Sequence, residues 1–331
     1  MGILYIIGNG FDRHHGVYSG YDSFSRWLKC HDREIYEVYR AVCSYKALWG
    51  DFETSMAYVR RDYFLDFAEG FMPDPNKDPD DLQAADIFLA GDWGASLAEQ
   101  LVERLKKDFH RWVKSIKPNA EYDSKMIDLV PEAKYLTFNY TMFLEEKYGI
   151  SPNMVKHIHG VKTDPKGTII VGHGEDNDEI FDRWLRYIKR PIKFTDKKGK
   201  TRYRPHRLKK FYFGGTSELP EYEHITERIW SYYEDAQKPV KQIIDVNEPY
   251  FHSLSDVGTI YVLGFSFSKV DSPYIAKIIE TNRNRDAIKW IVSYYDDVKD
   301  KKRALNCLLP LGVNEANIEF KTLESMQRNA N

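Results

Sequence analysis

The chain has 331 residues, 42% hydrophobic and 30% charged, so it can bury a sizeable core and disorder is not expected to dominate. Its 48 basic and 50 acidic side chains nearly cancel, so net charge points to no class of partner. Three scattered cysteines without a CxxC pair suit a reducing cytosol and exclude a four-cysteine zinc ribbon. Without an 18-residue apolar run or a signal-peptide pattern, we expect a cytoplasmic protein that does not enter the membrane.

The N-terminal residues predict a buried strand followed by a long helical region. Residues 3–7 form a nearly continuous apolar run that ends at Gly8, as in a parallel strand covered on both faces. Helical sequence extends over residues 21–116, except for a Pro- and Asp-rich loop predicted at 72–81. Near the end of this region, apolar residues at spacings of three and four mark one helix face: Leu97, Leu101, Leu105, Phe109 and Trp112.

Strand-like runs return in the second half of the chain, separated mostly by helical sequence. The runs cover residues 133–138, 154–158, 168–171, 259–263 and 287–294, and the clearest helices cover 141–148 and 272–284. This alternation predicts an α/β fold with a Rossmann-like, mostly parallel, doubly wound sheet. We expect one domain over residues 1–331, with a helical insert or lobe at 20–131 and a basic, helical insertion at 176–250.

The first strand ends in a glycine turn. Its sequence, GNGFD, comprises Gly8, Asn9, Gly10, Phe11 and Asp12. Glycine lets the backbone turn tightly and bring N–H groups close to a pyrophosphate, although an ordinary turn would look the same. Position 13 holds Arg13 where a full dinucleotide fingerprint has a third glycine. Asp12 could hold a ribose hydroxyl, pair with Arg13 or cap the loop.

Two further strands end in polar residues. Thr137 and Asn139 follow the strand at 133–138, where they could cap a helix, and where an asparagine could also fix a ribose hydroxyl or a water. His157 and His159 share one face of an extended segment, but no third metal ligand is evident in the neighbouring sequence. A single histidine suits general base catalysis, and a structural role is the alternative.

Two later turns complete the set of polar strand ends. His173 lies between two glycines after the run at 168–171, in a turn that either lines the same cleft or has no ligand. Gly264 and Ser266 follow the run at 259–263, where backbone donors and a hydroxyl would suit an adenosine ribose or a phosphate. A helix cap by Ser268, Asp271 or Ser272 is the alternative, and both can hold at the same time.

One segment stands apart in composition. Residues 183–210 contain 13 Lys or Arg residues, interleaved with Trp184, Tyr187, Phe194 and Tyr203. Basic segments with aromatic residues occur in nucleic-acid-binding proteins, but they also form solvated surfaces and oligomer contacts.

The sequence resembles the bacteriophage abortive infection AbiH family. The resemblance rests on YIIGNGFDRHHGVYSGYDSF near the start, LWGDFE at residues 48–53, LTFNYT at 136–141, IHG at 158–160 and VLGFSFSKVDSPY at 262–274. More distantly, the chain is similar to sirtuin-like proteins, which share the order of glycine turn, T-x-N, HG and late G-x-S.

The sirtuin-like resemblance implies roles for individual residues. Asn139 and His159 would act at the nicotinamide ribose, Gly8 and Gly10 would hold the phosphates, and the late G-x-S corresponds to Gly264 and Ser266. Two departures argue against protein deacylation, because the acid that usually follows T-x-N is replaced by threonine and no zinc ribbon is present. Sirtuin-like defence domains often hydrolyse NAD, and the resemblance implies this activity here.

The resulting expectation is a phage-defence enzyme that hydrolyses NAD to nicotinamide and ADP-ribose without a metal. His159 would accept a proton from water or a ribose hydroxyl, and Asn139 would position that group. We expect a homo-oligomer, triggered by a phage component or a defence partner. The rival interpretations are a non-catalytic NAD or ADP-ribose sensor and a nucleic-acid-binding protein.

Overall fold

The computed structural model describes residues 2–71, 83–117, 120–163, 169–205 and 220–328, so the loop predicted at 72–81 lies outside the described residues. Contacts divide the chain into two compact units. The first unit comprises Met1–Asp32, Lys107–Gly174 and Lys238–Asn331, and the second comprises Arg33–Lys106 and Glu175–Gln237. The single domain with inserts at 20–131 and 176–250 stays a prediction.

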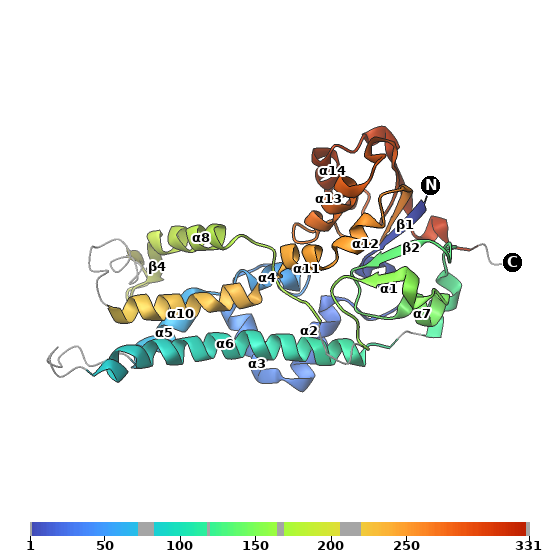
Figure 1. Cartoon of the computed structure of the whole chain (residues 1–331). Helices are drawn as coiled ribbons and strands as arrows, with labels where there is room; N and C mark the ends of the chain where they lie inside the picture. Colours follow the sequence, from blue (N-terminus) through green and yellow to red (C-terminus); the bar gives the residue numbers. More distant parts are fainter. Residues whose placement is uncertain (1, 72–82, 118–119, 164–168, 206–219, 329–331) are drawn as a thin grey trace. The chain divides into compact units, whose positions relative to one another are not determined.

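The first unit contains a six-stranded sheet in which every neighbouring pair is parallel. Its strands are β1 (Gly2–Ile7), β2 (Lys134–Thr137), β3 (Val155–His157), β6 (Val257–Leu263), β7 (Lys289–Tyr294) and β8 (Ile318–Thr322). Their order is β3-β2-β1-β6-β7-β8. The neighbouring strands β1 and β2 are labelled in Figure 1. The predicted α/β class with a parallel sheet is confirmed.

The strand order contains one reversal of direction. The chain moves outward from β1 through β2 to β3, returns to β6 beside β1, and then moves outward in the opposite direction to β8. Doubly wound sheets bind ligands at the carboxyl ends of their strands, in the crevice where the order reverses. The switch point of this sheet therefore lies between β1 and β6.

The central strands are held by apolar side chains on both faces. In β1, residues 4–7 are all buried, and Ile6 is aligned with Leu136 of β2 and Val262 of β6. On one face, the ring of Tyr5 stacks on Tyr135 at 4.9 Å and on Tyr261 at 4.8 Å between centroids. The continuous apolar run seen in the sequence is thus the signature of a strand covered on both faces.

Helices of the first unit connect these strands. They are α1 (Asn9–His14), α2 (Tyr21–His31), α7 (Phe143–Tyr148), α11 (Val240–Val246), α12 (Glu248–His252), α13 (Ser272–Thr281) and α14 (Lys299–Leu308). Short 3-10 helices cover Ala120–Lys125, Pro152–Met154, Arg285–Ala287, Leu309–Leu311, Glu315–Asn317 and Glu324–Met326. Ile275 and Ile278 of α13 are fully buried in the hydrophobic core that contains the β1 and β6 side chains.

The strand predicted at residues 168–171 is wrong over its described part. Residues 169–171 form no strand. Ile170 N–H donates to the His159 carbonyl at 2.9 Å, and the His173 carbonyl accepts from Lys238 N–H at 2.8 Å. Single hydrogen bonds to two different segments do not form the regular ladder of a β-sheet. This apolar run is therefore an irregular connection.

The second unit is mainly helical. It contains α3 (Arg33–Val42), α4 (Phe52–Met56), α5 (Arg61–Ala68), a 3-10 helix at Glu69–Phe71, α8 (Asn177–Lys189), α10 (Pro220–Ala236) and the hairpin of β4 (Ile192–Thr195) and β5 (Thr201–Arg204). Buried tyrosines tie its helices to backbone carbonyls: the Tyr232 hydroxyl donates to Met56 O at 3.2 Å and the Tyr233 hydroxyl to Val59 O at 2.8 Å.

The long helix α6 (Ala84–Ser115) contributes residues to both units. The predicted helix face is confirmed over most of its length, since Leu101, Leu105, Phe109 and Trp112 are buried and Leu97 is partly buried. In the described part of the chain, no helix combines the length and the apolar character needed to cross a membrane.

Candidate functional site

The carboxyl ends of β1, β2, β3 and β6 lie at one edge of the sheet, because these strands are parallel neighbours. Each end is followed by a motif predicted from the sequence: the glycine turn after β1, Asn139 after β2, His159 after β3 and Gly264 after β6. The glycine turn and Gly264 adjoin the switch point. Segments more than a hundred residues apart in the chain thus share one edge.

The glycines of the β1 and β6 turns allow the two loops to touch. Gly8 N–H donates to Leu263 O at 3.0 Å, and Gly10 N–H donates to Gly264 O at 2.8 Å. A Cβ on Gly8 would lie 2.5 Å from the Phe265 Cα, and a Cβ on Gly10 would lie 2.8 Å from the Gly264 Cα. Both amides are therefore engaged within the protein, and a phosphate would need other donors.

The rest of the GNGFD sequence is tied to the first unit. Asn9 Nδ2 donates to Ser19 O at 3.0 Å, while the Ser19 hydroxyl donates to the Asn9 side-chain oxygen. Phe11 is fully buried, with its ring 4.6 Å from that of His15 and 5.6 Å from that of Tyr148. The Phe11 side chain therefore serves the core, although it belongs to the predicted cofactor site.

Asp12, Asn139 and Thr141 form the first polar cluster. Asn139 Nδ2 donates to Asp12 Oδ1 at 2.7 Å and to Gly8 O at 3.1 Å, and the Thr141 hydroxyl donates to Asp12 Oδ2. All three side chains are buried. Burial raises the pKa of Asp12 to about 6, although hydrogen bonds from Thr141 and Asn139 oppose this rise. In sirtuin-like proteins the T-x-N motif usually continues to an acid, and here that position is Thr141. The carboxylate beside Asn139 comes instead from Asp12.

Thr137 and His157 fix the backbone around Asn139. The Thr137 hydroxyl accepts from Asn139 N–H at 3.1 Å. His157 places Nδ1 3.2 Å from Asn139 O and Nε2 2.8 Å from Glu145 Oε1. His157 therefore has a neighbouring carboxylate in α7, which the sequence did not reveal. Among the described residues, no group of three or more His, Cys, Asp or Glu is arranged to hold a metal ion.

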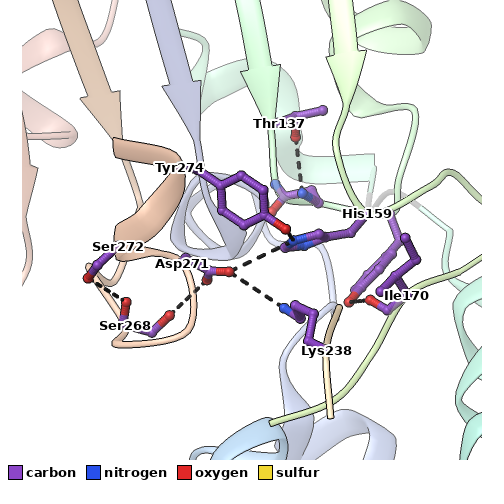
Figure 2. Close-up of polar contacts among 10 residues, drawn as sticks. Thr137, His159, Ile170, Lys238, Ser268, Asp271, Ser272 and Tyr274 are labelled. Atoms are coloured by element: carbon purple, nitrogen blue, oxygen red, sulfur yellow. Dashed lines mark hydrogen bonds and ion pairs between the residues drawn. The ribbon is translucent and has the colours of Figure 1, made fainter. Parts of the chain in front are cut away.

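His159 lies in a second polar cluster, formed by His159, Lys238, Ser268, Asp271 and Tyr274 (Figure 2). His159 Nε2 is 3.3 Å from the Tyr274 hydroxyl and 3.9 Å from Asp271 Oδ1. Burial, helped by the positive charge of Lys238, holds the pKa of His159 well below its usual range. The imidazole is therefore neutral at pH 7.

Sequence reasoning missed Lys238 and gave Asp271 no role beyond a helix cap. The Lys238 side chain is fully buried, and its Nζ is 3.5 Å from Asp271 Oδ1. The Ser268 hydroxyl donates to the other carboxylate oxygen of Asp271 at 2.8 Å. Figure 2 shows Asp271 joined by dashed lines to both Lys238 and His159. A lysine is rarely buried without a partner, and no motif in the surrounding sequence indicates this one.

The two remaining predicted residues lie in different surroundings. His173 is fully buried, and its carbonyl accepts from Lys238 N–H, so its backbone adjoins the second polar cluster. Ser266 is exposed, on the loop between β6 and α13.

The segment that follows β2 joins the two clusters. The ring of Phe138 is 5.3 Å from that of His159, and the ring of Tyr140 is 6.5 Å from it. Between them, Asn139 directs its amide to Asp12. The structure therefore brings Asn139 and His159 to the same sheet edge, with the asparagine in one cluster and the histidine in the other.

The sequence from residue 4 to residue 294 matches the model of a protein family described as bacteriophage abortive infection AbiH. The chain belongs to the AbiH family. This membership confirms the resemblance seen in the sequence and implies a role in abortive infection, a form of defence against phage. A search of curated proteins finds no match.

Both polar clusters of this AbiH protein lie within the matched residues. They combine a carboxylate with a pKa of about 6, a neutral imidazole and a fixed amide at one edge of a parallel sheet. A carboxyl group whose pKa lies near neutrality is suited to proton transfer at neutral pH, and a fixed amide is suited to positioning a hydroxyl or a water.

Proposed function

We propose that this AbiH protein binds NAD at the β1/β6 switch point and hydrolyses it to nicotinamide and ADP-ribose, which depletes NAD during abortive infection. The observation that carries the proposal is the strand order, because it brings the glycine turn, Asn139, His159 and Gly264 to one sheet edge. Dinucleotides bind at this edge in doubly wound folds. The sirtuin-like order of the same motifs supports NAD as the substrate.

One atom of the first polar cluster fits a substrate hydroxyl. Asn139 Oδ1 is buried and has no hydrogen-bond partner among the described residues. Leaving such an acceptor unsatisfied costs about 1–3 kcal/mol, which a ligand donor would recover. The amide nitrogen of the same residue is held by Asp12 and by Gly8 O, so the oxygen has a fixed direction. We assign it to a ribose hydroxyl of NAD or to the attacking water.

In the proposed reaction, water attacks the ribose carbon that carries nicotinamide. The bond between this carbon and the ring nitrogen breaks, and its electron pair neutralises the nicotinamide cation as it leaves. The water gives its proton to His159, which is neutral at pH 7. General base catalysis of this kind contributes about 10²–10⁴-fold to a rate. Asp271, 3.9 Å from Nε2, then stabilises the imidazolium.

The burial of both clusters supports a restrained resting state. His159 is 2% exposed and Asp12 is 1% exposed, so NAD reaches these groups only when the residues that cover them move. We propose that assembly of several copies, or contact with a phage component or a defence partner, promotes this opening. Such restraint would protect the NAD pool of an uninfected cell.

The proposal is tested by incubating the purified chain with NAD over a range of protein concentrations. Nicotinamide and ADP-ribose are then quantified by mass spectrometry. Wild type should release the two products in equal amounts, and Asn139→Ala should reduce release about 100-fold or more. Failure of wild type to release nicotinamide at any concentration would overturn the proposal.

Asn282 provides a matched control for Asn139. It is also a buried asparagine of the first unit, and its Nδ2 donates to Leu254 O and to Val257 O at the amino end of β6. Asn282→Ala should lower stability as Asn139→Ala does, but it should retain turnover. Equal loss of turnover in both variants would show that the Asn139 effect is only structural.

The burial of His159 also supports a second candidate, a non-catalytic sensor of NAD or ADP-ribose. In that case the ligand would bind at the same sheet edge and change the conformation without being cleaved. Calorimetry that detects NAD binding, together with no product by mass spectrometry, would favour the sensor.

A further inference from the structure

The hairpin of β4 and β5 differs from the parallel sheet because, in the part of the chain that the structure describes, its side chains are almost all exposed. Ile192 is its only partly buried strand residue, and the other seven are exposed. The strands pair antiparallel, with Lys193 opposite Tyr203 and Phe194 opposite Arg202. A two-stranded hairpin without a packed face is only marginally stable in water. The exposed side chains of this hairpin are free to contact a partner, and such a contact would stabilise it.

The hairpin, residues 192–204, is strongly basic. It carries six cations and one acid, and the cations are Lys193, Lys197, Lys198, Lys200, Arg202 and Arg204. The acid, Asp196, closes the turn: its Oδ1 accepts from the backbone N–H groups of Lys198 and Lys200, both at 2.9 Å. Its Oδ2 accepts from Arg202 Nε at 3.1 Å. The turn thus uses the only carboxylate and leaves the three lysine side chains of the tip exposed.

Each face of the hairpin presents a cation and an aromatic ring. Successive residues of a strand point to opposite faces, so Lys193 and Tyr203 share one face, and Phe194, Arg202 and Arg204 share the other. The Arg204 guanidinium lies 5.7 Å from the centroid of the Phe194 ring. Positive charge therefore surrounds the hairpin and is not confined to one side.

We propose that the β4–β5 hairpin binds double-stranded DNA, a property separate from NAD hydrolysis. The major groove of B-DNA admits a two-stranded β-ribbon, and phosphates line both of its walls. Cations on both faces and at the tip match that arrangement. A flat acidic protein surface would engage one face and leave the cations of the other face unpaired. The major groove of an RNA duplex is too narrow and deep to admit such a ribbon.

The test measures binding of the full chain to a duplex DNA by fluorescence anisotropy between 50 and 200 mM salt. If the five cations other than Arg202, which pairs with Asp196, contact phosphates, affinity should fall about 500-fold over this range, since each contact adds about 0.9 to the logarithmic salt slope. A variant with Lys197→Gln, Lys198→Gln and Lys200→Gln should bind more weakly and lose only about 12-fold over the same range.

A matched control removes three exposed lysines elsewhere, with Lys114→Gln, Lys241→Gln and Lys302→Gln. This control should keep the wild-type salt slope. The proposal is overturned if wild type binds no duplex DNA, if the tip variant binds like wild type, if the control loses as much as the tip variant, or if an RNA duplex of the same sequence binds more tightly. NAD turnover does not enter the readout, so the two proposals succeed or fail separately.

Discussion

The contact between the β1 and β6 turns predicts a specific effect of Gly264→Ala. Gly264 has a φ of +63°, a conformation that costs other L residues about 1–2 kcal/mol. A Cβ at this position would also collide with the Phe11 amide nitrogen and the Gly10 backbone. Forcing such a contact apart adds about 1–3 kcal/mol. We therefore expect Gly264→Ala to lower the free energy of unfolding by about 2–5 kcal/mol.

Gly149→Ala separates the two contributions. Gly149 has a similar φ of +67° at the end of α7, but an added Cβ would meet nothing within 4 Å. This variant should show only the conformational cost of about 1–2 kcal/mol. Urea unfolding followed by circular dichroism measures both variants against wild type. Equal losses would refute the argument that the Gly264 position is restricted by close packing of the two turns.

Two further predictions concern the polar clusters. Because burial raises the pKa of Asp12 from 3.8 to about 6, the folded protein loses stability as pH rises from about 4 to 6, by about 3 kcal/mol. Asp12→Asn removes this loss, so in urea titrations its stability relative to wild type should rise by that amount between pH 4 and pH 7; a constant difference would contradict it. Lys238→Met removes a positive charge that helps to lower the pKa of His159, so NMR titration of the imidazole should show a higher pKa, whereas an unchanged pKa would contradict this electrostatic effect. Because the pKa of His159 is lowered in the folded protein, the unfolded chain binds a proton first, and the free energy of unfolding falls as pH falls below the usual imidazole pKa of about 6.5. Lys238→Met should make this loss of stability smaller.

Much of the sheet could be predicted because its central strands are buried on both faces. The apolar run at residues 3–7 became β1, and the run at 259–263 became the last five residues of β6. The strand β8 was missed, since its sequence IEFKT mixes charged and apolar residues and its side chains are exposed or only partly buried. The run at 168–171 led to a wrong strand prediction because apolar side chains also pack in irregular connections. A short apolar run does not by its periodicity distinguish such a connection from a buried strand.

The site could be predicted only where a motif marked it. Asn139 and His159 follow strands and belong to recognisable sequence patterns. The pairing of Asp12 with Asn139 joins residues 127 positions apart, and it arises only when β1 and β2 align in parallel. Lys238 could not be found for a different reason: a lysine is almost always exposed, and only the folded structure places its ammonium beside Asp271.

The most direct test of the account compares the two histidines at the end of β3. His157 is bonded to Glu145 and to the backbone of Asn139, whereas His159 is the neutral base of the proposed reaction. Nicotinamide release from NAD is measured for wild type, His157→Ala and His159→Ala, each shown to be folded by circular dichroism. The account predicts that His157→Ala stays within about tenfold of wild type and that His159→Ala loses about 100-fold or more. Full activity in His159→Ala, or no release by wild type, would contradict it.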